Sequence, residues 1–287
     1  MSISVIPENI RALALDLDGT ILTPGAVLTE RTRRALQKCK ERGIRLIIST
    51  GRAVGTAEQF RVSLEAEGPM IYFNGALVSE MPENKILRTA MLDAKAAEFC
   101  VELSREMKVY CLIYFLDEAE QNGSKTTRIS LMAEWDGEER QMYYKHTGLI
   151  SELCDLKEEI LRRGNNGCVK AMFLTEPEVH NILRPRLEER LGKSIYIANT
   201  FKTFLEVMDA EASKGQGLEF VMKTLSLKRE EVIAFGDEES DIPLFAAAGF
   251  SVAPSNAKDA VKASSDLVVA SCAEDGVAAF LEEFFRL

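Results

Sequence analysis

Two carboxylates, Asp16 and Asp18, end an apolar run in the stretch LALDLDGT, residues 13–20. Like charges repel each other and are costly in apolar surroundings, so other groups must compensate this pair. Side chains two residues apart share one face of a strand, and Leu17 between them points to the other face. The pair can therefore act on one ligand while Leu17 lies in the core. The alternative is an ordinary strand-end turn whose carboxylates cap the backbone.

Other polar groups follow predicted strands or open a predicted helix. They lie in three short pieces of sequence: STGR (49–52), SKG (213–215) and GDEESD (236–241). In an open parallel sheet, ligands bind beyond the carboxyl ends of the strands. We therefore expect all three pieces to share one crevice with the opening pair.

The residue types in these pieces are those of a phosphoryl-transfer site. Four carboxylates offer the hard oxygens that Mg²⁺ prefers: Asp16, Asp18, Asp237 and Asp241. Thr50 offers a hydroxyl donor, and Lys214 offers a cation at a helix start, where an anion is also favoured. Gly19, Gly51 and Gly215 let the backbone approach a ligand. Taken alone, Lys214 is better explained as a solvated lysine at a helix start, because a cation is poorly placed against the helix dipole there without an anion nearby.

The two opening carboxylates can take different roles in such a site. A carboxylate can itself be the nucleophile, which gives an aspartyl-phosphate and divides one difficult step into two easier ones. Asp16 would attack phosphorus, and Asp18 would protonate the leaving oxygen and then deprotonate the hydrolytic water. Acid–base help of this kind contributes about 10²–10⁴-fold in rate.

Strands and helices alternate in the first and last parts of the chain, which predicts a doubly wound parallel sheet. The predicted strands are 12–16, 44–50, 70–80 (with a tight Asn74-Gly75 turn), 231–237, 250–254 and 266–270. The predicted helices are 29–43 (N-capped by Thr29), 51–68, 214–226, 240–249 and 275–285. The fold class is therefore α/β, with a Rossmann-like core.

The middle of the chain has longer segments, more aromatic residues and no strict alternation. Its predicted strands are 108–117, 127–135, 169–176, 194–200 and 203–208, and its predicted helices are 151–164 and 176–192. This pattern indicates an α+β domain inserted into the α/β domain. We expect the domains to be 1–82 with 210–287, and 83–209. A cleft between two domains is a usual place for a small-molecule site.

Composition excludes several classes of function. The net charge of −10, without a basic stripe, argues against nucleic-acid binding. No apolar run approaches the length of about 18 residues needed to span a bilayer, and no secretory signal is evident. Six scattered cysteines without a CxxC pair fit reduced thiols in a cytoplasmic protein. The two histidines, His146 and His180, stand too far apart in the sequence to suggest a metal site.

The chain resembles the haloacid dehalogenase superfamily of phosphatases, and within it the Cof-type branch with a C2B cap. The resemblance covers nearly the whole chain. It is carried by DLDGT (16–20), STGR (49–52), FNGA (73–76), SKG (213–215), GDEESD (236–241), SNAKDAVKASSD (255–266) and EDGVAAFLEEF (274–284). The resemblance implies that the inserted domain is a mobile cap that closes over the substrate and excludes water.

By this resemblance, Asp16 is the nucleophile, Asp18 is the general acid and base, and Thr50 and Lys214 orient the phosphate. The implied Mg²⁺ ligands are the carboxylates of Asp16 and Asp237, the backbone carbonyl of Asp18, and a water ordered by Asp241. Ser240 stands where the family usually has Asn, and VAPSNA (252–257) replaces a run usually rich in Gly and Met. No core catalytic group is lost by these two departures.

A second set of residues is expected to contact substrate or phosphate. It consists of Gly51, Arg52, Asn74, Gly75, Ser240, Asn256 and, in the inserted domain, Lys170. For Arg52 a surface ion pair is as good an explanation, and Asn74-Gly75 is equally a plain turn.

The leading interpretation is a Mg²⁺-dependent phosphomonoester hydrolase whose substrate is a small phosphorylated metabolite, with sugar phosphates as the expected class. A phosphomutase or phosphotransferase on the same fold is the first alternative. A non-catalytic protein that binds a phosphorylated metabolite is the second. The sequence leaves the oligomeric state open, with a monomer or a dimer equally consistent.

Overall fold

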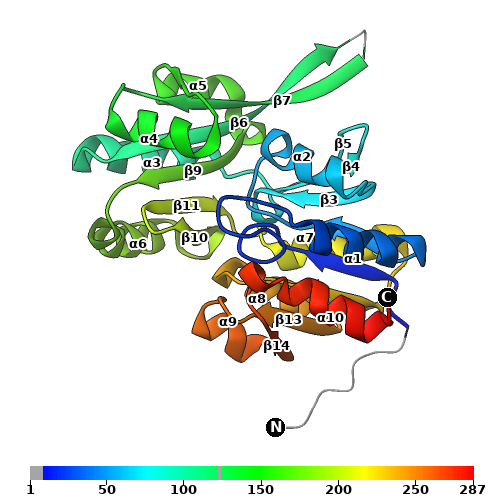
Figure 1. The fold of residues 1–287 in the computed structure, drawn as a ribbon. Helices are drawn as coiled ribbons and strands as arrows, with labels where there is room; N and C mark the ends of the chain where they lie inside the picture. Colours follow the sequence, from blue (N-terminus) through cyan, green and yellow to red (C-terminus); the bar gives the residue numbers. More distant parts are fainter. Residues whose placement is uncertain (1–8, 122–123) are drawn as a thin grey trace. The chain divides into compact units, whose positions relative to one another are not determined.

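The computed structural model describes residues 9–121 and 124–287, and the chain forms two compact units (Figure 1). Of the described residues, the first unit comprises 9–88 and 213–287, and the second comprises 89–121 and 124–212. The boundaries therefore fall at 88/89 and 212/213, rather than at the expected 82/83 and 209/210. The first boundary is later because a strand over residues 85–89 pairs in a sheet with strands of the first unit, and all but its last residue belong to that unit.

A five-stranded parallel sheet forms the centre of the first unit. Its order is β14 (Leu267–Val269), β13 (Phe250–Pro254), β12 (Val232–Phe235), β1 (Ala12–Leu15) and β2 (Arg45–Ile48). Every residue of β1 and β12 is buried. Such uninterrupted apolar runs are typical of strands that are covered on both faces.

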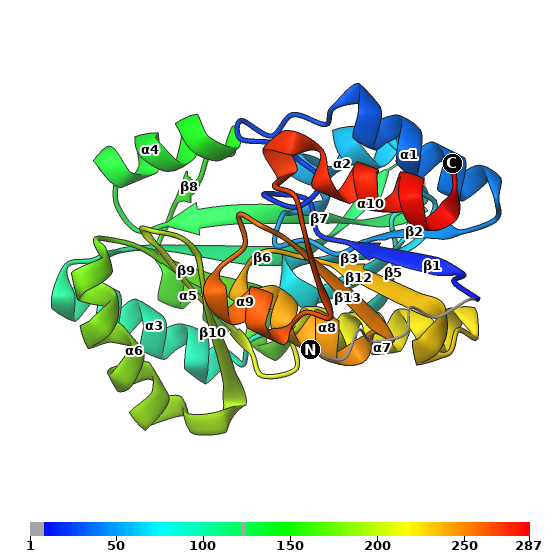
Figure 2. The same ribbon diagram turned by 60° about the horizontal axis from the view of Figure 1, so that its bottom comes forward.

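Helices cover both faces of this sheet, as predicted for a doubly wound fold (Figure 2). One face carries α7 (Lys214–Leu225), α8 (Ile242–Ala247) and α9 (Asp259–Ser264), and the other carries α1 (Glu30–Glu41), α2 (Val54–Ser63) and α10 (Gly276–Phe285). Leu218 and Leu244 pack in one apolar core with Ala14. On the opposite face Phe280 meets Phe235, with ring centroids 5.8 Å apart.

A small sheet of three strands lies beside β2. It consists of β3 (Gly68–Tyr72), β4 (Leu77–Met81) and β5 (Lys85–Thr89) in that order. β3 and β4 are antiparallel and are joined by a 3₁₀ turn at Phe73–Gly75, which contains the predicted Asn74-Gly75 turn. The Thr50 N–H donates to the Ile71 carbonyl (2.9 Å), which links this sheet to the end of β2.

The second unit is an α+β structure around a six-stranded sheet. The strand order is β10 (Ile195–Phe201), β11 (Phe204–Asp209), β9 (Cys168–Leu174), β6 (Tyr110–Gln121), β7 (Ser124–Ala133) and β8 (Glu152–Leu153). All pairs are antiparallel except β7 with β8. Its helices are α3 (Ala94–Met107), α4 (Glu138–Thr147), α5 (Leu156–Arg163) and α6 (Pro177–Leu191).

One face of this second sheet packs on three of the helices. Leu103 of α3, Leu156 of α5 and Leu183 of α6 form a single buried core with Ile113 and Phe173 of the sheet. Helices α3 and α4 were not expected from the sequence, and the predicted helix 151–164 begins instead with strand β8. Among the described residues, none of the helices is both long and apolar enough to cross a bilayer.

Candidate active site

The candidate active site lies where the strand order of the parallel sheet reverses direction. Asp16 follows β1, and the two neighbours of β1 in the sheet are β2 and β12, which come from distant parts of the chain. Asp237 follows β12, and the Asp16 N–H donates to the Phe235 carbonyl at 3.1 Å. Ligands of open parallel sheets bind at such a reversal.

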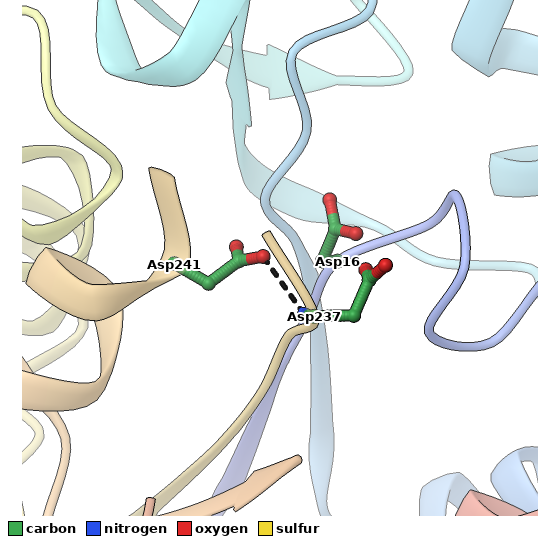
Figure 3. Close-up of side chains that lie close together, drawn as sticks. All are labelled: Asp16, Asp237 and Asp241. Carbon is green, nitrogen blue, oxygen red and sulfur yellow. Dashed lines mark hydrogen bonds between the residues drawn. The ribbon is translucent and has the colours of Figure 1, made fainter. Parts of the chain in front are cut away.

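Three carboxyl groups converge at this point and form what we call the acidic cluster: Asp16, Asp237 and Asp241 (Figure 3). Each residue offers one oxygen, and these oxygens all lie within 4.8 Å of one another. All three residues are buried. Asp241, in the 3₁₀ turn Glu239–Asp241, accepts hydrogen bonds at Oδ2 from the backbone N–H groups of Asp237 and Glu238, both at 3.0 Å.

The turn after Asp16 depends on glycine for its close approach to the cluster. Gly19 has φ +75°, which side chains other than glycine rarely adopt. A Cβ added there would lie 2.2 Å from Asp237 Oδ2. A glycine at this position is therefore needed for the loop to reach the acidic cluster.

Lys214 is buried within the acidic cluster, only 2% exposed, so the solvated alternative is wrong. Its Nζ donates to Asp16 Oδ1 at 2.7 Å and to Asp241 Oδ1 at 2.6 Å. It is the first residue of α7, whose N-cap Ser213 accepts from the Gln216 N–H at 3.2 Å. Although burial alone would lower the pKa of Lys214, its attraction to Asp16 and Asp241 raises it, so the lysine is charged.

Three carboxyl groups face one ammonium in the cluster, so its net charge is negative wherever more than one of them is ionised. Burial raises the pKa of Asp16 well above its ordinary value; the nearby carboxylates add to this, and Lys214 opposes it. Burial, and then repulsion from Asp241, raises the pKa of Asp237 to about 7. The Thr20 hydroxyl lies 2.7 Å from Asp237 Oδ1 and 3.2 Å from Asp16 Oδ2. Buried oxygens with unbalanced charge fit a hard divalent cation.

Asp18 is held by Arg52 rather than by the acidic cluster. Arg52 donates from Nε to Asp18 Oδ2 and from Nη2 to Asp18 Oδ1, both at 2.6 Å. The Asp18 side chain is 43% exposed, whereas Leu17 is fully buried, as expected. Arg52 thus forms an ion pair, and its partner is a candidate site carboxylate; its contact with substrate stays a prediction.

Thr50 lies at the end of β2 against the Phe73–Gly75 turn. Its Oγ1 accepts from the Arg52 N–H at 3.1 Å, which leaves the hydroxyl hydrogen available to a ligand. The Thr50 carbonyl accepts from the Asn74 N–H at 3.0 Å. A Cβ added to Gly51 would lie 3.0 Å from Asn74 Oδ1, so the Asn74 side chain packs closely on that glycine.

The remaining predicted residues occupy different settings. Ser240 is buried in the 3₁₀ turn that also carries Asp241. Asn256 donates from Nδ2 to the Gly19 carbonyl (2.8 Å) and accepts at Oδ1 from the Cys272 N–H (2.8 Å), so it supports the glycine turn. Lys170 belongs to the second unit. Contacts of these three residues with substrate stay predictions.

Two residues that contact predicted site residues were given no role in the sequence analysis: Thr20, beside the acidic cluster, and Glu206, beside Lys170. Thr20 bridges Asp16 and Asp237, and its place four residues after Asp16 in DLDGT was the available signal. Glu206 is the partner of Lys170, with its Oε1 2.5 Å from the lysine Nζ. The signal there was one acid and one base, each within an otherwise apolar strand.

Comparison with known proteins agrees with this geometry. The model of the haloacid dehalogenase-like hydrolases matches residues 13–281. A 5-amino-6-(5-phospho-D-ribitylamino)uracil phosphatase of Bacillus subtilis is 28% identical over 96% of this chain and 97% of its own. A pyridoxal phosphate phosphatase of Escherichia coli is 27% identical over 94% of this chain and 97% of its own. These relatives support the predicted phosphatase.

Solved structures share the fold over the same extent. A haloacid dehalogenase-like hydrolase from Bacteroides thetaiotaomicron superposes with a TM-score of 0.80 at 23% identity, over 96% of this chain and all of its own. Because the family match spans both units and includes every residue of the acidic cluster, this chain belongs to the haloacid dehalogenase-like hydrolase family.

Proposed function

We propose that this protein is a Mg²⁺-dependent phosphomonoester hydrolase that acts through an aspartyl-phosphate. The observation that carries the proposal is the buried acidic cluster with Lys214 bonded to two of its members. An excess of buried negative charge is unfavourable unless a cation joins it. A nucleophilic carboxylate, a hard cation and an ammonium are the parts that phosphoryl transfer requires.

The proposed phosphate contacts come from Lys214 and Thr50. The charged Lys214 would bind phosphoryl oxygens, and the Thr50 hydroxyl, with its oxygen already accepting from the Arg52 N–H, would donate to one of them. Asp16, Asp237 and the Asp18 carbonyl would hold Mg²⁺, with Asp241 ordering one of its waters. When bound, the ion supplies positive charge that favours the ionised form of Asp16 and offsets the charge of the phosphate.

In the first step, an Asp16 oxygen attacks phosphorus and the bond to the leaving alcohol oxygen breaks. Asp18 gives that oxygen its proton. In the second step, Asp18 takes a proton from water, and the water oxygen attacks phosphorus. Inorganic phosphate leaves and the Asp16 carboxylate is restored. Arg52 donates to both Asp18 oxygens in this structure, so one of these two hydrogen bonds must break before Asp18 can carry the proton that it gives to the leaving oxygen.

For the substrate we propose a small phosphorylated metabolite, with sugar phosphates as the expected class. The two named relatives act on different small phosphate esters. The shared part of such substrates is the phosphate, and it is the part that the acidic cluster, Lys214 and Thr50 would recognise. The remainder of the substrate must be recognised elsewhere.

The test is phosphate release by purified protein with Mg²⁺, first from an aryl phosphate and then across phosphorylated sugars, nucleotides and pyridoxal phosphate. We expect release that EDTA abolishes and Mg²⁺ restores. Turnover that persists in EDTA would contradict the metal assignment. Phosphoryl transfer between sugar positions, dependent on a bisphosphorylated sugar and without net phosphate release, would instead establish the mutase alternative. Binding without turnover would establish the non-catalytic alternative.

A further inference from the structure

Thr50 and Lys214 must lie at a fixed spacing if both are to hold one phosphoryl group, yet they come from separate elements. Thr50 follows β2, and Lys214 opens α7 after the whole inserted unit. A displacement of about 1 Å in such a site can cost on the order of 100-fold in rate. Some contact within the first unit must therefore join the two elements.

The Phe73–Gly75 turn lies against the Thr50 side of the site. The Asn74 N–H donates to the Thr50 carbonyl at 3.0 Å, and the Phe73 N–H donates to the Arg52 carbonyl at 3.1 Å. These two bonds fix the turn to the segment that contains the Thr50 hydroxyl.

The same turn touches the start of α7. Gly75 has φ +98°, and a Cβ added there would lie 2.1 Å from the Ser213 carbonyl oxygen. The turn is also strained, since Phe73 (φ +50°) and Asn74 (φ +53°) are in the left-handed region without being glycine. Residues in this conformation persist only where their surroundings impose it. The turn must therefore be held in place by its neighbours.

Arg88 supplies a link between this turn and α7. Its Nη1 donates to the Gly75 carbonyl at 2.8 Å, and its Nη2 donates to Gln216 Oε1 at 3.2 Å. Gln216 lies in the first turn of α7, two residues after Lys214, and its N–H bonds the N-cap Ser213. One guanidinium thus connects the turn beside Thr50 to the helix end that carries Lys214.

We propose that Arg88 is a positioning residue for the phosphate site: it joins the Phe73–Gly75 turn to the first turn of α7 and so fixes the spacing of Thr50 and Lys214. The two groups that Arg88 would position, Thr50 and Lys214, are the proposed phosphate contacts, so the larger effect is expected on phosphate binding and not on Mg²⁺. The planar guanidinium suits this task because it bonds two acceptors in a fixed geometry, whereas an ammonium is a point donor. This role rests on the proposed function.

The test compares Arg88→Met with the unaltered protein in three measurements: kcat for an aryl phosphate, inhibition by inorganic phosphate, and the Mg²⁺ concentration for half-maximal activity. We expect kcat to fall about tenfold or more. The inhibition constant for inorganic phosphate should rise about fivefold, because the same two groups bind it, and half-saturation by Mg²⁺ should stay within about twofold. Arg88→Lys should show a smaller loss.

Arg31→Met is the matched control. Arg31 also donates two hydrogen bonds, to Glu282 Oε1 at 3.2 Å and Oε2 at 2.7 Å, but on the exposed surface of α1 and α10. It should leave all three measurements unchanged. A double variant with Gln216→Met should lose little beyond Arg88→Met, since both changes remove one link.

The proposal is overturned if Arg88→Met keeps the original kcat and phosphate inhibition, or if its Mg²⁺ half-saturation shifts by the same factor as its phosphate inhibition. If Arg88→Met does not fold, Arg88→Lys decides: values equal to the unaltered protein overturn the proposal, and a selective loss of phosphate inhibition supports it. If the unaltered protein hydrolyses none of the phosphate esters, the proposed function fails, and binding of inorganic phosphate by the same variants still tests Arg88.

Discussion

Among the residues whose burial is described, each unit buries one lysine, and the two lysines differ in the charge around them. Lys214 and Lys170 are both 2% exposed, and both have a carboxylate oxygen within 2.7 Å of Nζ. Lys214 bonds Asp16 and Asp241 and has Asp237 as a third acid nearby. In the contacts described above, Lys170 pairs with one carboxylate, Glu206, and its Nζ lies 4.9 Å from the centre of the Tyr114 ring.

The two lysines therefore differ in the ratio of acids to bases around them. The acidic cluster has three carboxyl groups for one ammonium, whereas the contact between Lys170 and Glu206 joins one of each. A buried ion pair of equal charges can satisfy itself through hydrogen bonds and ring contacts, although it contributes little net stability. A buried ammonium among three carboxylates leaves negative charge that bound protons or a further cation must balance. Burial of a lysine is therefore weak evidence for catalysis, whereas an unbalanced cluster at the end of a strand is strong evidence for a ligand.

The largest expected effect comes from Asp16→Asn, which removes the proposed nucleophile with little change of shape. Phosphate release should fall by at least about 10⁴-fold, as when a covalent nucleophile is lost elsewhere. The measurement is the initial rate on an aryl phosphate with saturating Mg²⁺. Asp259→Asn is the control, because Asp259 is fully exposed on α9 and pairs with Lys262. Full turnover by the Asp16 variant would contradict the nucleophile assignment.

Replacing each lysine by Met tests the comparison directly. Lys214→Met should reduce kcat about 10²–10³-fold, because a charge that stabilises the reacting phosphate is lost. Lys170→Met should instead lower the free energy of unfolding by about 3–5 kcal/mol, because Glu206 remains buried without its ion pair. Urea unfolding and initial rates, both with Mg²⁺ present, distinguish the two outcomes. Equal losses of turnover in the two folded variants would remove the distinction between the clusters.

In the absence of metal, the free energy of unfolding should decrease as the pH rises, because the pKa of Asp237 is raised in the folded protein. The pKa of Asp237 is raised to about 7 in the folded protein, against about 3.8 for an unperturbed group. The native state therefore holds a proton that the unfolded state has released. This contribution to stability is fully present below about pH 4 and is lost as the pH rises through about 7. Asp16, whose pKa is also raised, acts in the same direction.

The measurement is the free energy of unfolding in EDTA between pH 5 and pH 8, for the unaltered protein and for Asp237→Asn. The unaltered protein should lose stability with rising pH more steeply than the variant. Mg²⁺ added at pH 8 should restore stability, because it binds the folded state. Parallel curves for the two proteins would show that Asp237 does not titrate in this range.

The convergence of Asp16, Asp237 and Lys214 could be predicted from the sequence because these residues follow strands or open a helix in short motifs. Asp16, Asp237 and Lys214 each stand at the boundary of an element whose pattern is strong: an apolar run for β1 and β12, and a serine N-cap for α7. Their convergence follows from parallel sheet topology, which brings the carboxyl ends of the strands to one edge. Local sequence patterns were therefore sufficient to predict that these three residues converge.

Contacts between distant residues could not be predicted in the same way. Arg88 and Gln216 are 128 positions apart, and neither stands in a motif. Helix α4 was missed because Tyr143 and Tyr144 favour strands by propensity, whereas in the structure Tyr143 packs on Phe204 from a helix that begins after Gly137. Tertiary packing determines both the contact between Arg88 and Gln216 and the helical conformation around Tyr143, and contacts between distant residues cannot be read from local patterns in one sequence.

The smallest expected effect belongs to the double variant Lys170→Met with Glu206→Leu. Each single change removes one member of the buried Lys170–Glu206 pair and keeps the charge of the other, but the double change removes both charges and keeps similar volume. Its free energy of unfolding should lie within about 1 kcal/mol of the unaltered protein, although each single variant loses about 3–5 kcal/mol.

The double variant also tests the predicted role of Lys170 in binding substrate. If the pair is only structural, KM for the best phosphorylated metabolite should not change, because the folded sheet of the second unit is retained. If KM rises for that metabolite while KM for an aryl phosphate stays the same, Lys170 recognises the part of the substrate beyond the phosphate. In that case a buried pair of equal charges can also bind substrate. Charge balance would then no longer distinguish a lysine with a function, such as Lys214, from a structural one. Destabilisation of the double variant by the sum of the two single losses would show, in contrast, that the two side chains are not coupled.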